Sequence, residues 1–423
     1  MLQRKHLPDL AVALVLASGF FWLYAHFGLR LAQGIYFDYL NLAFDFDPPY
    51  FIDFLVGTLP SGVNYKHPLS MLFRPFASLF LLLGFEPKAA AALVMALFGG
   101  LTVALVYAFA CLAQFGRLLA VAAALFFGAS STPLFTAIVV ESYGWASFSI
   151  VLVWCVYLVG ERAKVVPTQA ALFAAVLAAG VTITNIMQAV VAYFFAKLKE
   201  QGFKKAVWQT IKFGLYAGLA LVLVLAILQP QELWSVFSRP VQTAKEVYWL
   251  RTKGTATGVI ELLLTFFGYS FVSPAFAQVA LSPDVTMLDF RTFAYTRAEQ
   301  LVVFGWWAFA VFGCVMGFRH RQFRYVAAPL LVVVVLNLLF HLDYQFRGSL
   351  YLYAAHLHFP IFALAMGAAP WAASQRRSVS MVYAVMLLAL AASVLVINMQ
   401  RATTFVTLFD TLAFPPDAPA IKR

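Results

Sequence analysis

The chain has 423 residues, of which 63% are hydrophobic and 11% are charged, and its formal net charge is +11. A mean hydropathy of +0.85 excludes a water-soluble globular protein. Repeated apolar runs, each long enough to cross a bilayer at about 20 residues, predict an all-α polytopic membrane protein. Residues 1–423 are expected to form a single transmembrane domain.

Eleven apolar runs are interpreted as membrane spans. The first follows Arg4-Lys5-His6 and has no clear small-residue cleavage site, so we expect an uncleaved helix rather than a signal peptide. The fifth and sixth runs, residues 168–183 and 185–197, can also be interpreted as one long helix. We prefer two spans, because two crossings place the Lys-rich segment 197–212 on the same side of the membrane as the other basic loops. The predicted spans are residues 10–29, 89–112, 118–133, 143–160, 168–183, 185–197, 206–228, 301–318, 324–341, 350–369 and 378–399.

The charges are distributed unequally between the two ends of these spans. Alternate loops carry 15 of the 29 Lys and Arg residues but only three of the 18 acids, namely Asp9, Glu161 and Glu200. Such positive-inside asymmetry predicts a cytoplasmic N-terminus and an external tail from Gln400 onward. It also accounts for the net charge, so no nucleic-acid partner is inferred.

Two loops on the predicted outer side are long, residues 30–88 and residues 229–300. In the first, the apolar stretch from His67 to Gly84 is too short to span and predicts a helix lying along the interface. In the second, the stretch "VIELLLTFFGYSFV" is equally short. The two halves of the chain show no internal repeat, which favours chemistry at the outer surface over a symmetric transport path.

Asp45 and Asp47 form an Asp-x-Asp motif at the head of the first outer loop. Two carboxylates at this spacing can share a divalent cation such as Mg²⁺ or Mn²⁺, or one can act as a base while the other tunes its pKa. The alternative is an ordinary solvated turn, since Asp and Pro are common loop residues.

Other polar residues are predicted to reach the same face. Lys66 and His67 precede the interfacial helix, where a contact with lipid headgroups is the alternative role. Glu141 lies at the expected outer end of the fourth span, where complementing the helix dipole is the alternative.

The segment "NLLFHLDYQFRGSLYLYAAHLHFP" contributes a further polar group. His341, Asp343 and Arg347 fall in a short outer loop, and His356 and His358 enter the next span. Histidines within a membrane usually face a polar cavity. Because His356 and His358 are two residues apart, they cannot share a helix face, and at most one is expected to line a site.

Several of these short motifs together resemble the GT-C superfamily of membrane glycosyltransferases. The resemblance rests on Phe44–Asp47, on His67-Pro68-Leu69, on Glu141-Ser142-Tyr143, and on the stretches "GVTITN" (180–185) and "LYAAH" (352–356). It covers the first half of the chain and the ninth and tenth spans. Many relatives carry an Asp-Glu pair or His-Pro-Pro, where this chain has Asp-x-Asp and His-Pro-Leu.

The resemblance implies an enzyme of the bacterial cytoplasmic membrane whose active site faces outward. A polyprenyl-phosphate-linked sugar would be the donor, and a lipid, glycan or protein would be the acceptor. Asp45, or otherwise Asp47, would be the catalytic base, and the pair would hold any divalent cation. The residues expected to bind substrate are Lys66, His67, Glu141, His341, Asp343, Arg347 and His356.

Three other functions compete with this one. A flippase or transporter of lipid-linked saccharides would explain the histidines but not the one-sided loops. An O-antigen polymerase or ligase would use paired arginines in the second long loop, for which Arg239 with Arg251 or Arg291 with Arg297 are the candidates. A non-catalytic membrane scaffold would have no need of converging polar segments.

Overall fold

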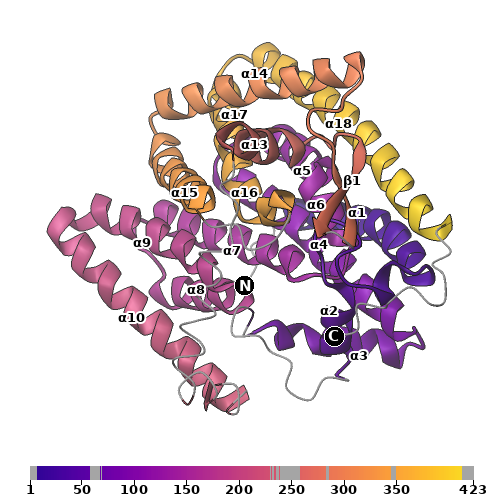
Figure 1. Cartoon of the computed structure of the whole chain (residues 1–423). Coiled ribbons are helices and arrows are strands. Elements are labelled where there is room, and N and C mark those ends of the chain that lie inside the picture. Colours follow the sequence, from indigo (N-terminus) through magenta and orange to yellow (C-terminus); the bar gives the residue numbers. More distant parts are fainter. Residues whose placement is uncertain are drawn as a thin grey trace.

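The computed structural model describes residues 7–57, 67, 69–228, 258–282, 285–343 and 349–411, with a few single positions between 229 and 238. Helices dominate this part of the chain (Figure 1). The α-helices are α1 (Leu7–Gln33), α2 (Pro48–Val56), α3 (Arg74–Leu82), α4 (Pro87–Leu112), α5 (Arg117–Ala129), α6 (Ser131–Ile138), α7 (Ser142–Ala163), α8 (Thr168–Val181), α9 (Ile186–Gln201), α10 (Phe203–Leu228), α13 (Val259–Leu264), α14 (Arg297–Arg319), α15 (Arg324–Asp343), α16 (Ala354–Ala365), α17 (Ala369–Ser374) and α18 (Arg377–Thr411).

Short helical turns and one β-hairpin complete the structure. The hairpin pairs β1 (Phe276–Ser282) with β2 (Val285–Phe290) in an antiparallel arrangement. The 3₁₀ turns are η2 (Tyr36–Asp38), η3 (Ser70–Phe73), η4 (Ile183–Asn185), η6 (Leu350–Tyr353) and η7 (Met366–Ala368), and η5 (Thr265–Tyr269) is a π-helical turn that continues α13.

Each of the eleven predicted spans coincides with helical structure, and the expectation of an α-helical membrane protein is confirmed. Eight helical segments among the described residues are long and apolar enough to cross a membrane, and the bent pair α5–α6 would make a ninth. The short helices α8 and α9, of 14 and 16 residues, fall below the usual span length of about 20 residues. α8 and α9 are thus the two predicted spans that are missing from the nine candidate segments.

The predicted span at 118–133 is not a continuous helix. α5 and α6 meet at an angle of 57°, and Ser130 between them is extended. Pro133 explains the break, because its ring would clash with the carbonyl of Ala129 four residues earlier. The freed Ala129 carbonyl accepts a hydrogen bond from Asn398 on α18 at 2.8 Å. A distant helix therefore satisfies the backbone of this break.

The helices pack in two groups around α7. On one side α1 and α5 pack against both α4 and α18, and on the other α14, α15 and α16 pack against one another. α8, α9 and α10 form the outer edge (Figure 1). Glycine permits the closest approach, since a Cβ added to Gly313 on α14 would lie 1.6 Å from the carbonyl oxygen of Ala365. Small residues commonly allow such contacts between membrane helices.

The described parts of the two long loops are structured, but only the first matches its prediction closely. α3 occupies the predicted interfacial stretch and exposes Leu79, Leu82 and Leu83, as a helix lying on a membrane surface would. In the second loop, α13 and η5 cover the predicted short apolar helix. The β-hairpin that follows was not predicted, and it adds strand structure to the expected all-α fold.

Candidate functional site

The Asp-x-Asp motif forms a buried, strained turn rather than a solvated one. The N–H of Phe46 donates to the carbonyl of Ala43 at 3.1 Å, which closes a four-residue turn. Its two central residues, Phe44 and Asp45, have φ values of 53° and 60°. Type I′ turns have this geometry and normally use Asn-Gly. A buried aromatic residue with positive φ persists only where its surroundings hold it, and such strain is common at functional sites.

Packing on both sides holds this turn. The Phe44 ring is fully buried, with its centroid 4.8 Å from the rings of both Phe290 and Tyr351. Its backbone N–H donates to the carbonyl of Leu288 at 2.9 Å, and the Leu288 N–H donates to Leu42 at 2.8 Å. The turn thus joins β2 as a short parallel bridge. The unpredicted hairpin is therefore part of what positions Asp45.

The two acidic side chains converge on the amide of Asn41. One terminal atom of that amide lies 2.5 Å from Oδ1 of Asp45 and 3.1 Å from Oδ1 of Asp47. The amide nitrogen faces the acids and donates to both Oδ1 atoms. Among the described residues, this turn included, His, Cys, Asp and Glu form no group of three or more suited to a metal ion. The cation predicted at Asp45 and Asp47 therefore stays a prediction.

Glu141 holds the acidic turn against the start of α7. Its Oε2 accepts from the backbone N–H of Asp47 at 3.0 Å, and its Oε1 accepts from the N–H of Ser142 at 2.9 Å. It therefore caps the helix, as the dipole alternative anticipated, and also fixes the position of Asp47. Glu141 is only 4% exposed. Its carboxylate oxygens therefore bind the backbone of the turn and of α7 and do not face a solvent-filled cavity.

Tyr36 lies beneath the acids with a buried hydroxyl. This oxygen has no hydrogen-bond partner among the described residues. Burial raises the pKa of Tyr36 well above its usual value, and the negative charges of Glu141 and Asp47 raise it further. The phenol is therefore neutral and can donate a hydrogen bond near the carboxylates.

Asp289 is a third carboxylate at the turn, and no sequence motif marked it. It lies on β2 next to Leu288, the residue that bridges to the turn. Burial raises its pKa from 3.8 to about 6, and the charges of Glu261 and Asp45 add to this effect. The N–H of Phe290, 2.7 Å from Oδ1 of Asp289, acts in the opposite direction. A carboxyl group with a raised pKa beside a second acid is typical of functional sites.

A group of rings extends from the acidic turn toward the histidines. Tyr143, two residues after Glu141, has its ring centroid 6.3 Å from Phe46, 5.4 Å from His356 and 6.4 Å from Tyr353. Tyr353 in turn lies 4.9 Å from the ring of His341. The segments that carry the acids and these two histidines therefore meet around Tyr143.

The other two histidines have separate surroundings. His67 bonds through Nδ1 to the carbonyl of Val181 at 2.8 Å, which anchors the end of the first loop to α8. His358 points away from the polar group, with its ring 4.3 Å from Phe271 and 5.1 Å from Phe127. His356 and His358 thus diverge, as their spacing predicted.

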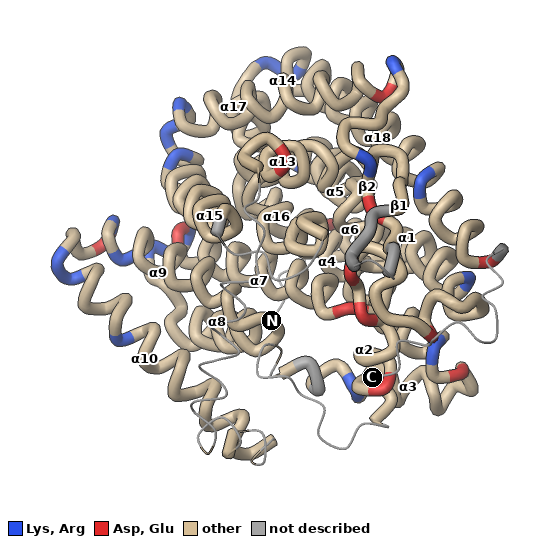
Figure 2. Tube along the Cα trace, viewed as in Figure 1, with Lys and Arg blue, Asp and Glu red and all other residues tan. Residues whose placement is uncertain are grey.

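Several predicted residues lie outside the described part of the chain. Lys66 and Arg347, expected to meet a phosphate, are among them, and so are Arg239 and Arg251. Asp343 ends α15, but its side chain is not described. Several of the acids in Figure 2 lie near α2 and the hairpin, and others lie on α13, α9 and α14, whereas basic residues mark the ends of α9, α14 and α15.

No protein-family model matches this chain, and no curated protein matches it. The geometry alone therefore defines the chemistry available. Asp45 and Asp47 converge on the Asn41 amide at a strained turn, the charge of Asp45 acts on Asp289, and a neutral phenol and a row of aromatic rings lie nearby. Such a group can accept a proton and stack against a sugar ring.

Proposed function

We propose that this chain is a GT-C-type membrane glycosyltransferase that uses a polyprenyl-phosphate-linked sugar. It would act at the outer face of a bacterial cytoplasmic membrane on a lipid, glycan or protein acceptor. The topology that goes with this proposal has eleven crossings, a cytoplasmic N-terminus and an external C-terminus. The observation that carries the proposal is the buried turn in which Phe44 and Asp45 both have positive φ.

The reaction assigned to this turn is a displacement at the anomeric carbon. The acceptor oxygen bonds to that carbon while the bond to the lipid phosphate breaks, and the phosphate leaves with the electron pair. The acceptor proton moves to a carboxylate. Asp45 is the first candidate for this base, because it is buried at the tip of the strained turn, and Asp47 is the second.

Neighbouring groups support these roles. Glu141 and Asn41 fix the relative positions of the two acids through the contacts described above. Tyr143 and His356 offer an aromatic face and an imidazole for a sugar ring. Lys66 and Arg347 are proposed to meet the phosphate charge.

The proposed divalent cation would be held by Asp45 and Asp47, whose Oδ1 atoms converge on the Asn41 amide. When bound, it would stabilise the negative charge on the leaving phosphate. With or without this cation, the turn positions the acids and one carboxylate receives the proton.

The test measures sugar transfer from a panel of polyprenyl-phosphate hexoses and pentoses by the purified full chain in lipid vesicles. We expect Asp45→Asn to lower the rate about 100- to 10,000-fold, the range for loss of a general base. Asp53→Asn, in the same loop on α2, is the matched control and should retain the wild-type rate. Donor turnover must release the lipid phosphate, whereas a flippase would move the donor unchanged.

Two outcomes would contradict the proposal. One is a wild-type chain that consumes none of the donors. The other is near-wild-type transfer by both Asp45→Asn and Asp47→Asn at normal expression, which would remove the acids from the chemistry.

A further inference from the structure

A polar pocket lies at the end of the helix bundle opposite the acidic turn. Its volume is about 440 Å³, within the range of about 300–1,000 Å³ typical of small-molecule sites. Glu141 caps the start of α7, and Arg162 near its other end lines this pocket. At 1.5 Å per residue, the two sites are about 30 Å apart. The pocket therefore belongs to a different surface from the acidic turn.

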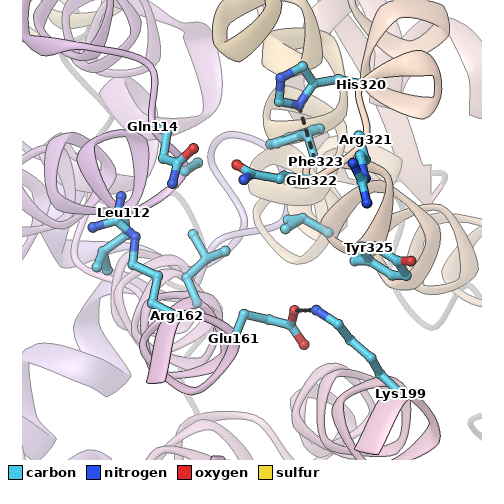
Figure 3. Close-up of a pocket in the computed structure, with 13 residues that line it drawn as sticks. Leu112, Gln114, Glu161, Arg162, Lys199, His320, Arg321, Gln322, Phe323 and Tyr325 are labelled. Carbon is cyan, nitrogen blue, oxygen red and sulfur yellow. Dashed lines mark hydrogen bonds and ion pairs between the residues drawn. The ribbon is translucent and has the colours of Figure 1, made fainter. Parts of the chain in front are cut away.

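Hydrogen-bond donors from four segments surround the pocket (Figure 3). Gln114 follows α4, Arg162 lies near the end of α7, Lys199 comes from α9, and the turn between α14 and α15 supplies the others. The donors on that turn are His320, Arg321 and Gln322. The Gln114 and Gln322 amides lie on opposite sides of the opening in Figure 3.

Positive charge is in excess at this end of the bundle. Its three acids are each engaged: Asp9 pairs with Arg117 at 2.7 Å, Glu161 with Lys199 at 2.5 Å, and Glu200 with Lys197 at 2.7 Å. Arg321 has no carboxylate partner among the described residues.

His320 adds a neutral donor to this charge. Partial burial lowers the pKa of His320, so its ring is neutral at pH 7. Its Nδ1 accepts from the N–H of Phe323 at 3.2 Å, which leaves the proton on Nε2. The pocket thus combines an uncompensated guanidinium with uncharged N–H groups, a donor set suited to phosphate oxygens.

Gln114 has a backbone that glycine would suit better. The N–H of Gln114 donates to Cys111 and the N–H of Phe115 donates to Ala110, at 3.2 and 3.1 Å. These two bonds form a Schellman ending for α4, in which the residue at the position of Gln114 is usually glycine. Gln114 has φ +64°, so its side chain is kept at a conformational cost.

We propose that this pocket binds a phosphate group, through Arg321 and the Gln114 amide, beside the ion pair of Lys199 with Glu161. The phosphate can belong to a lipid headgroup or to a soluble compound. Basic pockets between membrane helices on the cytoplasmic side commonly hold anionic headgroups. The site is independent of sugar transfer at the other end of the bundle.

The experiment titrates the purified full chain with two probes in separate arms. One arm uses phosphatidylglycerol in nanodiscs of phosphatidylcholine, and the other uses inorganic pyrophosphate with the chain in neutral detergent. The variants are Arg321→Ala and Gln114→Gly, and Lys205→Ala on α10 is the control. Gln114→Gly removes only the amide and places glycine where the helix ending favours it, so the fold is retained, which thermal unfolding checks.

We expect saturable one-to-one binding in at least one arm. Affinity should fall at least tenfold in Arg321→Ala and in Gln114→Gly, and less than twofold in Lys205→Ala. Saturation by the lipid alone identifies a headgroup site, and saturation by pyrophosphate identifies a site for soluble phosphate compounds. The proposal is overturned if neither probe saturates, if both pocket variants bind as the wild type does, or if the control loses affinity equally.

Discussion

Replacing Asp289 by Asn should stabilise the protein at pH 8 and leave its stability unchanged near pH 3.5. Burial raises the pKa of this carboxyl from 3.8 in the unfolded chain to about 6 in the folded protein. The folded state therefore favours the neutral form, and the charged form costs free energy once the pH exceeds the folded pKa. At 1.36 kcal/mol per pKa unit, the full cost above about pH 6 is about 3 kcal/mol.

The sign of this dependence follows from proton binding. Between about pH 4 and pH 6 the folded state holds the Asp289 proton that the unfolded state has lost, so the wild type loses stability as the pH rises. Asn is uncharged and nearly isosteric, and it removes the cost without emptying the space. Thermal unfolding in detergent at pH 3.5, 5, 6.5 and 8 measures the difference between the two chains.

A matched control separates burial from any general effect of removing an acid. Asp38 is exposed and pairs with Lys88 at 2.6 Å, and such surface pairs contribute about 0–1 kcal/mol. Asp38→Asn should therefore change stability little, and in the destabilising direction. Equal stability of Asp289→Asn and wild type at pH 8, or a loss there, would refute the reasoning.

Three further predictions concern packing and hydrogen bonds, and thermal unfolding measures each. Glu141→Ala removes the acceptor of two backbone N–H groups and should cost about 1–3 kcal/mol; Glu141→Gln keeps an acceptor and should cost less, so equal losses would contradict the capping role. Gly313→Ala forces a Cβ against the carbonyl of Ala365 and should cost about 1–3 kcal/mol, whereas Gly305→Ala meets nothing within 4 Å and should be nearly neutral. Asn398→Leu leaves the Ala129 carbonyl at the α5–α6 break and the Ser273 N–H without their donor and acceptor, and should cost about 2–3 kcal/mol; a neutral outcome would mean that these groups are satisfied otherwise.

Features that depend on local composition can be predicted from the sequence. A run of about 20 apolar residues has few alternatives to a membrane helix, and the predicted runs all coincide with helices. The spacing of His356 and His358 correctly implied that they face apart. Glu141 was placed at a helix start because the apolar pattern resumes directly after it, and it does cap α7.

Other features depend on contacts between residues far apart in the chain. The turn at Asp45 has positive φ because β2, more than 240 residues later, pairs with it, and the residues of the turn do not themselves favour that geometry. Asp289 has an ordinary local sequence, and only its burial beside Asp45 raises its pKa. Pro133 causes the break at Ser130, but the backbone carbonyl that the break frees is paired because Asn398, on a distant helix, donates to it.

The sequence by itself determined that this chain is a bundle of apolar helices with most acids at one end of the predicted spans, because hydropathy and charge act locally along a helix. The tertiary structure decided which of those acids become neighbours. It placed the Asp45 turn against β2, where the charge of Asp45 acts on Asp289, and it fixed Asp47 through Glu141, because the electrostatics of a carboxylate depend on the groups packed against it in space.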